Sequence, residues 1–566
     1  MAGRLVSITS HSPGVSGLDL QREFSARGVG WATKALNCVL DESGRLSSRN
    51  GWEKQNSTAL TGSPDIVQLY EYINSGASTD QVFSSSTALW HNMSSPSNIS
   101  GSVSISAGNW KFQNFKGSVV GAQQGHEPVI YSGSGNFTYL VDEHTTWTAS
   151  ASRSVDDTIV PTVHNGYYYQ CTTAGMSSAS EPTWDTTPNT GTTSDGTAVW
   201  TTREIPKSNE LLSAWGRLWV VDPNTPSVLH YSDLLIPEVF HGGSAGSIDL
   251  QAVWTNGQDE IVALAAFNSS LIILGKDSIV VYSNADDVLN ISLQEVVYGT
   301  GCIARDSVRQ IDEDLLYLAK DGIRSLKRDL VRQKMPLSTV TENIRDDIVQ
   351  AIASEDVDKV RSAYYKNGSF YCVLFPTSME IYVLDVRRYL TNGQVSVFKW
   401  DDLGGAKSLA SFENGSLMLG MPGYVGKYSG YTDNGSPYTM RFKSAWIDPH
   451  KEWGDMSLSG RTLILKRLEG ITGSTLNLQP SLEWFLDYAN SPHDSRVIQL
   501  IGDGSSEYGL AEYGVDDYAG GDTRHRFNVN TTGHGQVFAF GMNVVISGAK
   551  IYLASINNYF TIGRTG

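Results

Sequence analysis

The sequence predicts a mainly β fold, with a propeller-like body of repeated hairpins, a small β insertion and a C-terminal β-sandwich-like domain. Short runs of β-branched and aromatic residues alternate with Gly, Asn, Asp and Ser clusters along most of the 566 residues. Paired runs recur roughly every 45–55 residues, which is the spacing of a four-stranded propeller blade. An irregular array of β-sandwiches is the alternative that the same pattern allows.

The repeat consists of about seven hairpins, each with an apolar strand, a short polar turn and a second strand that often ends in Tyr. Because a blade buries its faces only against neighbouring blades, the ring must close to be stable. The paired strands are expected at residues 82–83 with 89–90, 119–120 with 129–131, 215–221 with 228–231, 271–274 with 279–282, 315–318 with 322–326, 370–374 with 381–384, and 417–419 with 425–428.

The hairpin period divides the chain, because it is interrupted once and stops near residue 432. The β-rich remainder is expected to form a domain of its own. The predicted parts are an extended N-terminal docking segment with a hairpin (1–60), the first blades (61–141), an inserted module (142–203), the remaining blades (204–432) and the C-terminal domain (433–566).

Helical periodicity is rare. It is clearest over residues 339–352, where Thr339 and Glu342 fit a capping box and Ile344 and Ile348 begin an apolar stripe. A weaker helix is expected near residues 18–24.

Residues 142–203 are rich in Thr, Ser, Asp and Trp, and they lengthen one hairpin interval well beyond the others. Insertions into surface loops cost little, so this stretch is predicted to be a small module carried on a blade. The Asp195–Gly196 pair predicts a hairpin turn within it. Four aromatic residues are candidates for stacking on sugar rings, and the alternative is that Trp184 and Trp200 form the core of the module. The four candidates are Tyr167, Tyr169, Trp184 and Trp200.

The chain has 59 acidic and 42 basic residues, a formal net charge of −17. This balance excludes a protein that grips nucleic acid by neutralising its phosphates, but not one past which nucleic acid slides. No apolar run approaches the ~18 residues of a membrane span, and no secretion leader is expected. The four cysteines lie far apart, so buried reduced thiols are expected rather than a zinc site or disulfide framework.

Motif searches predict no catalytic, cofactor-binding or metal site. Residues 420–428 differ from a phosphate loop in their glycine spacing and in Tyr428, and they fit the last hairpin better. Residues 194–200 resemble a sialidase Asp-box only loosely, because the residue between Ser and Asp is missing. The tyrosine-rich loop 508–518 matches no calcium loop and is predicted to be a subunit contact or a rim loop. Three pairs of adjacent carboxylates are expected to be solvated loop or helix-end charges: Asp259 with Glu260, Asp346 with Asp347, and Asp516 with Asp517.

The N-terminal stretch is the most specific feature of the sequence. Residues 35–45 combine Asn37 with an Asp-x-x-Gly turn at 41–44, and residues 49–52 read Arg-Asn-Gly-Trp. This block resembles the opening of tail nozzle proteins of short-tailed bacteriophages, the tail tubular protein B group, which begin with an Asn-containing strand, a D-x-x-G turn and an R-x-G-W close. Residues 533–564 are similar to the end of such proteins, and the EPTW and DGTAVW elements of the insertion are similar to small modules in phage tail proteins.

The resemblance implies a structural virion protein of the tail, without catalysis, assembled in the host cytoplasm. Six copies would form the distal tail tube, docked on a tail adaptor protein and contacting tail fibre or spike proteins, and the tube would retain genomic DNA and then conduct it. Six chains of −17 would place 102 negative charges around one channel, which lets DNA slide without sticking. The alternatives are a glycan-degrading propeller enzyme and a receptor-binding protein acting through residues 142–203.

Overall fold

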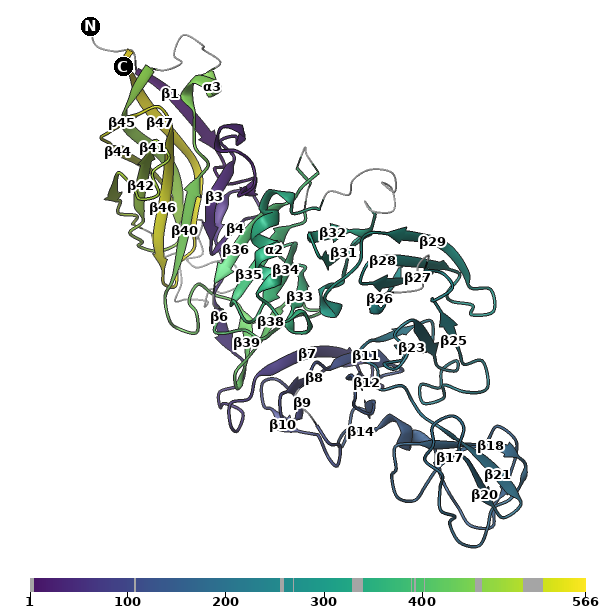
Figure 1. Cartoon of the computed structure of the whole chain (residues 1–566). Helices are drawn as coiled ribbons and strands as arrows, with labels where there is room; N and C mark the ends of the chain where they lie inside the picture. Colours follow the sequence, from purple (N-terminus) through teal and green to yellow (C-terminus); the bar gives the residue numbers. More distant parts are fainter. Residues whose placement is uncertain are drawn as a thin grey trace.

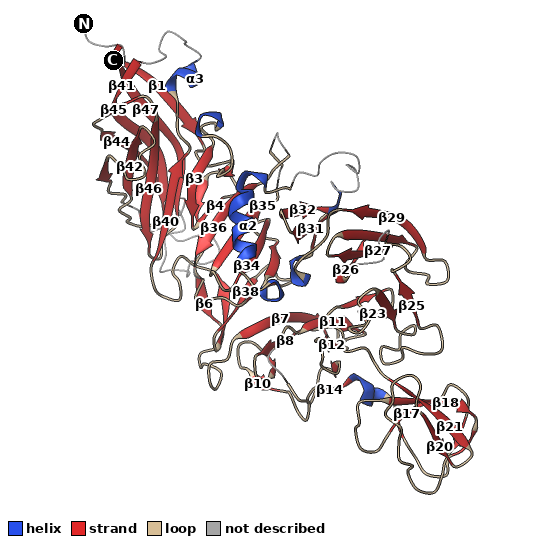
Figure 2. Cartoon of the chain, in the orientation of Figure 1, coloured by secondary structure: helices blue, strands red, loops and turns tan. Residues whose placement is uncertain are grey.

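The computed structural model describes residues 5–105, 108–254, 259–267, 269–327, 339–387, 389–390, 393–401, 403–453, 461–501 and 523–565. Strands dominate, and the helices are few and short (Figure 2). Figure 1 shows a propeller between two other bodies, a two-sheet sandwich at the end that holds both termini and a small module at the opposite end.

The first four blades are four-stranded antiparallel sheets whose strands follow one another in the chain. Blade 1 consists of β7 (Ile66–Ile73), β8 (Thr79–Ser85), β9 (Leu89–His91) and β10 (Ser97–Asn98); blade 2 of β11 (Lys111–Phe115), β12 (Ser118–Ala122), β13 (Val129–Tyr131) and β14 (Thr138–Tyr139); blade 3 of β22 (Leu211–Ala214), β23 (Arg217–Val221), β24 (Val228–Tyr231) and β25 (Gly246–Asp249); and blade 4 of β26 (Ile261–Phe267), β27 (Ser270–Gly275), β28 (Ser278–Ser283) and β29 (Ser292–Tyr298).

The last three blades vary this plan. Blade 5 has three described strands, β30 (Arg309–Ile311), β31 (Asp314–Ala319) and β32 (Gly322–Ser325), and it follows the 3₁₀ turn η3 (Arg305–Ser307). Blade 6 consists of β33 (Arg361–Tyr365), β34 (Phe370–Phe375), β35 (Glu380–Asp385) and β36 (Ser396–Asp401), after the 3₁₀ turn η5 (Val357–Lys359). Blade 7 consists of β37 (Ser408–Ser411), β38 (Leu417–Met421), β39 (Tyr424–Tyr428) and β6 (Trp52–Lys54).

The blades form a closed ring. The first strands of neighbouring blades lie side by side around it, and β37 of blade 7 packs against β7 of blade 1. Buried apolar clusters fill the space between successive blades, as in the cluster of Val120, Ile130, Leu211 and Leu218 between blades 2 and 3. The alternative of an irregular sandwich array is therefore wrong, and the protein is a seven-bladed β-propeller. All seven predicted hairpins pair as expected.

Blade 7 takes its outermost strand from the N-terminal part of the chain. Strand β6 pairs antiparallel with β39, with Trp52 opposite Tyr428 and Lys54 opposite Gly426. The ring is thus closed by hydrogen bonds between segments almost 400 residues apart. The prediction grouped residues 1–60 as one extended docking segment, whereas β6 within it belongs to the propeller.

The sandwich joins the N-terminal and C-terminal strands. One sheet has the order β4 (Cys38–Leu40), β5 (Leu46–Ser48), β47 (Ile551–Thr565), β41 (Arg461–Ser474) and β44 (Thr523–Asn530), with β1 (Leu5–His11) on β47 and β45 (His534–Gly535) on β41. The other sheet continues blade 6 from β36 through β3 (Trp31–Leu36), β40 (Tyr438–Ser444), β46 (Phe538–Ile546), β42 (Ser481–Leu486) and β43 (Asp494–Val497), with β2 (Gly17–Leu18) on β3. The predicted C-terminal domain is therefore completed by N-terminal strands.

The inserted module has a sheet and a core of its own. Its strands are β15 (Thr145–Thr146), β17 (Thr158–Val160), β18 (Tyr168–Thr173), β21 (Ala198–Arg203) and β20 (Thr192–Asp195), with a separate pair of β16 (Ser152–Arg153) and β19 (Gly175–Met176). The predicted hairpin turn joins β20 to β21, and Gly196 there has φ +63°, a conformation that favours glycine. The module follows η2 (Leu140–Glu143) after blade 2.

The predicted helices are found only in part. Helix α2 (Arg345–Ala353) follows η4 (Glu342–Ile344), and Ile344 and Ile348 are buried as expected. The capping box of Thr339 and Glu342 is wrong, because neither η4 nor α2 has a side-chain cap, and the Thr339 hydroxyl is buried without a hydrogen-bond partner among the described residues. The helix expected near 18–24 is also wrong: strand β2 ends there and only the 3₁₀ turn η1 (Phe24–Ala26) follows. A short helix not expected from the sequence is α3 (Pro449–Trp453).

Candidate functional site

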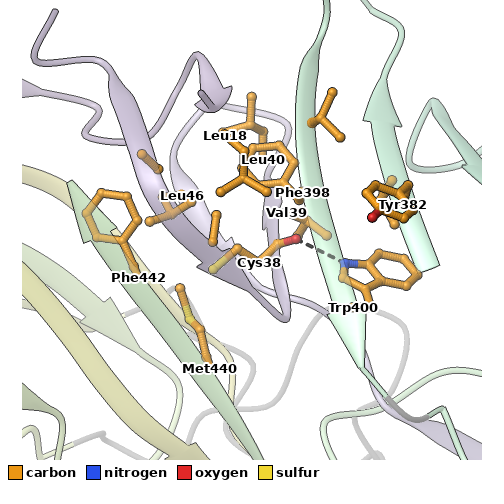
Figure 3. Packing of buried hydrophobic residues seen from close by; sticks show 14 of the residues in the cluster. Leu18, Cys38, Val39, Leu40, Leu46, Tyr382, Phe398, Trp400, Met440 and Phe442 are labelled. Atoms are coloured by element: carbon orange, nitrogen blue, oxygen red, sulfur yellow. Dashed lines mark hydrogen bonds between the residues drawn. The ribbon is translucent and has the colours of Figure 1, made fainter. Parts of the chain in front are cut away.

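The block that resembles nozzle proteins lies at the joint between propeller and sandwich. Its hairpin, β4 and β5, packs between β36 of blade 6 and β40 of the sandwich (Figure 3). Trp400, fully buried, donates a hydrogen bond from its indole to the Cys38 carbonyl over 3.0 Å. Leu46 and Phe442 fill the sandwich side of the same apolar cluster. The joint is therefore a continuous core rather than a linker.

Asn37 ties the two bodies together with its side-chain amide. The amide nitrogen donates to the Asp401 carboxylate of blade 6 at 2.5 Å and to the Thr439 carbonyl of the sandwich at 2.8 Å. The amide oxygen accepts from the Arg49 guanidinium at 2.9 Å. The backbone of Asn37 has φ +57°, which Asn tolerates better than most residues. These contacts give the Asn of the resemblance a structural role.

Arg49 is fully buried at the centre of the joint. It makes a bidentate ion pair with Asp433, at 2.9 and 2.8 Å, and its guanidinium lies 4.0 Å from the centre of the Tyr438 ring. Burial alone would lower the pKa of the Arg49 guanidinium, but the bonds and charge of Asp433 outweigh burial and raise it. A planar guanidinium whose donors are bonded in this way holds the segments of Arg49 and Asp433 in one relative position.

The two glycines of the block are required for different reasons, Gly44 for its turn conformation and Gly51 for a close backbone contact. Gly44 closes the Asp-x-x-Gly turn with φ +72°, and Asp41 in that turn accepts hydrogen bonds from the Arg45 amide and guanidinium at 2.9 and 2.7 Å. A Cβ on Gly51 would lie 1.9 Å from the Thr432 carbonyl oxygen, so only glycine fits. Trp52, the next residue, begins the strand that closes the propeller.

A second polar site lies at the propeller axis, where residues at the starts of the inner strands converge. Arg305 donates to the Asp306 carboxylate at 2.6 Å and to the Asn109 carbonyl at 3.1 Å. Arg361 donates to the Val67 carbonyl at 3.1 Å and lies 3.6 Å from the same Asp306 carboxylate. These contacts join blades 1, 2, 5 and 6. We call the cluster of Lys111, Glu210, Arg305, Asp306 and Arg361 the axial plug.

Glu210 brings blades 3 and 4 into the axial plug. One carboxylate oxygen accepts from the Lys111 ammonium of blade 2 at 2.5 Å and from the Leu264 amide of blade 4 at 3.3 Å. The charged groups of Glu210, Arg305, Asp306 and Arg361 are almost completely buried, at 2–3% exposure. The plug therefore links six blades through groups that water does not reach.

The charges of the axial plug are strongly coupled. Burial raises the pKa of the Asp306 carboxyl, but the Arg305 and Arg361 guanidinium groups outweigh burial and hold that pKa well below its usual range. Burial lowers the pKa of Arg361 to about 10, against the opposing charge of Asp306. Burial also raises the pKa of Glu210 despite the nearby Lys111. Asp306 thus stays ionised between two guanidinium groups.

Two recesses lie on either side of the plug. The entry recess, about 340 Å³, is lined by residues at or before the starts of inner strands, including Asn209 and Ile303. The exit recess, about 320 Å³, is lined by later residues of the same strands, including Gln68 and Tyr364. Because buried side chains fill the space between the recesses, the propeller axis offers no passage for a polymer.

The four aromatic residues predicted for sugar contact lie in or against the module core. Tyr169 and Trp200 are fully buried, so neither ring has a free face for a sugar. Tyr167 and Trp184 are partly buried and pack on that core, with the Trp184 ring 4.3 Å from that of Tyr169. The geometry favours the core interpretation for Trp200, and a sugar contact through Tyr167 or Trp184 stays a prediction.

Asp195 organises the module. Its carboxylate accepts hydrogen bonds from the indoles of Trp147 and Trp200, at 2.9 and 3.2 Å, and from the Ser178 amide at 2.8 Å. Burial raises the pKa of Asp195, but these donors outweigh it and lower the pKa overall. The carboxylate of the Asp-box-like segment is therefore engaged within the module.

The remaining sequence candidates have structural contacts. Residues 420–428 form the β38–β39 hairpin of the last blade, as expected. Asp259 accepts hydrogen bonds from the amides of Glu260 and Lys276, and Asp347 accepts from the Tyr382 hydroxyl at 2.8 Å. Asp346 and Asp347 are helix-end charges as expected, since both lie in the first turn of α2, whereas Asp259 is held by its hydrogen bonds rather than simply solvated. The loop 508–518, with Asp516 and Asp517, lies outside the described residues.

The four cysteines, Cys38, Cys171, Cys302 and Cys372, are buried as expected. In the described part of the chain, no group of three or more His, Cys, Asp or Glu side chains is placed to hold a metal ion. No helix in the same ranges is long and apolar enough to cross a membrane.

Sequence reasoning missed Arg49, Asp433 and the axial plug. Lys111, Arg305 and Arg361 each stand at or shortly before the start of an inner strand, where an apolar residue is usual, and these inner strands lie outside the predicted hairpins. Which charges meet depends on ring closure, which local patterns do not encode.

Comparison with known proteins finds only slight likenesses, and these are to solved structures. No family model and no curated protein matches the chain. PorZ of Porphyromonas gingivalis, described as an essential surface component of the type-IX secretion system, is 11% identical with a TM-score of 0.32, over 66% of this chain and 37% of PorZ. The WD40 β-propeller domain of Doa1 is 7% identical, with a TM-score of 0.33, over 67% of this chain and 96% of that domain. Hsv2 of Kluyveromyces lactis is 10% identical, with a TM-score of 0.25, over 59% of this chain and 96% of Hsv2. Such low scores carry no argument, so the propeller assignment is based on the closed ring of seven sheets.

Proposed function

We propose that this protein is a structural component of the tail of a short-tailed phage, a nozzle subunit without catalytic activity. Six copies would surround a passage for genomic DNA, docked on a tail adaptor and contacting fibre or spike proteins. The observation that carries the proposal is the joint, where Asn37, Arg49 and Gly51 of the resembling block all have mechanical roles.

The sealed axis supports the same proposal by limiting where DNA can pass. Because the axial plug fills the propeller centre, a channel has to be formed between subunits rather than through one of them. The joint also favours a role in the wall of a tail tube. A subunit that bears pressure from packaged DNA has to keep its propeller and sandwich in one relative position. The net charge of −17 is compatible with a polyanion gliding past.

The test is a three-dimensional map of tails from purified particles whose copies of this chain carry a label in the exposed turn at residues 186–190. We expect six labels around the tail axis and an open passage bounded by the subunits. A label missing from the particles, or present away from the tail axis, would contradict the proposal.

A second candidate function is receptor or glycan binding by the inserted module, as part of the same tail. It is favoured by the place of the module, at the end of the molecule opposite the termini (Figure 1), and by its separate hydrophobic core. Exposed apolar side chains also stand on it, with Val163 77% exposed and Met176 52% exposed. Replacing residues 145–203 by a short Gly/Ser linker is expected to leave particles intact and reduce adsorption to host cells. Normal adsorption of intact particles would exclude this role.

A further inference from the structure

The entry recess of the propeller combines an acidic floor with apolar walls. Glu210 lines its floor, and Asp222, Glu260 and Asp358 line its sides. The walls between these carboxylates are formed by apolar side chains from blades 3 to 6. They are Val221, Ile261, Val262, Ile303 and Val357. The volume of about 340 Å³ is enough for one extended side chain or a small chain-like molecule.

Glu210 has an unused carboxylate oxygen. Its Oε1 is engaged by Lys111 and Leu264, whereas its Oε2 has no hydrogen-bond partner among the described residues. The side chain is 98% buried, since only 2% of its surface is exposed. A buried acceptor without a donor costs roughly 1–3 kcal/mol, and more when the group is charged. A donor entering the recess would remove that cost.

The charge balance of the recess favours a cationic donor. Of the two basic residues that line it, Lys276 is paired with Glu260, and Arg305 is already bound to Asp306. Asp222 accepts hydrogen bonds from its own turn, at the Asn224 amide and the Thr225 hydroxyl. Glu210 is paired with Lys111 of the axial plug through Oε1 alone, so its Oε2 still lacks a donor among the described residues. A metal ion fits poorly, because it needs several oxygen ligands and the walls here are apolar.

We propose that the entry recess binds a primary ammonium or guanidinium group at the end of an alkyl stem. The cationic head would bond to Oε2 of Glu210, and the stem would pack along Val221, Ile261 and Ile303. Two sources share this chemistry, a Lys or Arg side chain of a partner protein and a free polyamine. This site does not depend on the proposed role in a phage tail.

The test is calorimetric titration of the full-length protein at low salt with two probes, 1,5-diaminopentane and Nα-acetyl-lysine N-methylamide. We expect saturable binding of one probe molecule per chain, weakened at least about tenfold by Glu210→Gln. If the lysine derivative binds at least as tightly as the diamine, the source is a protein side chain. If only the diamine binds, the source is a free polyamine.

Two further variants keep the test decisive. Val357→Trp fills the mouth of the recess without touching the plug, and it is expected to abolish binding even if Glu210→Gln unfolds the propeller. Asp286→Asn removes one exposed carboxylate outside the recess and is expected to leave binding unchanged. Absence of binding for both probes, or binding that Val357→Trp leaves intact, overturns the site.

Discussion

The propeller and the sandwich differ in charge and in the way they are held together. Residues 52–428, the propeller with its module, hold 41 acidic and 25 basic residues, whereas the rest of the chain holds 18 and 17. Nearly all of the net charge of −17 therefore belongs to the propeller and module. If DNA passes this protein, the repulsion that keeps it from sticking comes from the propeller side, and the sandwich is free to pack against neutral or acidic neighbours.

The two bodies also use buried charge differently. In the propeller, five charged groups meet at the axis and link six blades. At the joint, the buried Arg49 guanidinium pairs with Asp433, and within the sandwich the buried Glu469 carboxylate pairs with Arg467 and Arg526. Removing one partner of such an interaction leaves an unpaired buried charge, which lowers the free energy of unfolding. One substitution in each region therefore tests that region separately.

The largest effect is expected from Arg49→Met. The substitution removes the ion-pair partner of Asp433 and one of the two donors to the Asn37 amide oxygen, which keeps the Asp401 amide. We expect the free energy of unfolding to fall by about 3–5 kcal/mol, measured by denaturant titration. The matched control is Lys320→Met at an exposed ion pair with Asp277, where a change below about 1 kcal/mol is expected. Equal losses in the two variants would mean that the joint is not a stabilising element.

A smaller effect, about 3 kcal/mol, is expected from Asp306→Asn in the axial plug, because Arg305 and Arg361 lose their shared carboxylate. The pKa of Asp306 is depressed in the folded state, so its stabilisation is full above the unfolded pKa of about 4 and is lost as pH falls below it. The difference in unfolding free energy between wild type and variant should therefore shrink below pH of about 4. A difference independent of pH would contradict the ion-pair explanation.

The third effect is expected on acidification, which should weaken the contact between module and propeller by about 2 kcal/mol. His144 stacks on Tyr168 at 4.3 Å and contacts the Thr158 hydroxyl and the Glu238 carbonyl. Burial lowers its pKa from 6.5 to about 4, so the folded state holds the imidazole neutral. This stabilisation is present above pH of about 6.5 and is lost as pH falls towards 4.

The measurement is hydrogen exchange in strand β18 between pH 7 and 4.5, corrected for the intrinsic pH dependence of exchange. Burial also lowers the pKa of His241 to about 4, with further lowering by the charges of Arg203 and His230, so His241 contributes a dependence of the same sign. Protection of β18 should fall with pH in the wild type and much less in the double variant His144→Gln, His241→Gln. The same fall in both proteins would show that the two histidines are not responsible.

Local patterns predicted what is local in this fold. The seven hairpins were predictable because apolar alternation and polar turns act within about twenty residues, as in the pairing of residues 271–274 with 279–282. The sheet that runs from blade 6 into the sandwich was not, because it depends on the single pairing of Leu36 with Lys399. The capping box of Thr339 and Glu342 failed because the first helical turn begins at Glu342, which puts Thr341 at the N-cap position, and the Thr341 hydroxyl has a tertiary partner. At the candidate sites, the sequence marked Asn37 and Gly51 as unusual but gave no sign that Arg49 meets Asp433.

The pairing of the chain ends has a consequence for synthesis. Strand β6 can close the ring only after its partner β39 has been synthesised. Strand β1 pairs along its length with β47, from Leu5 opposite Thr561 to His11 opposite Ser555. A ribosome must therefore reach residue 565 before the sandwich can form. Products of translation interrupted before β47 would lack the partner strand of β1 and β5, so their sandwich would stay incomplete.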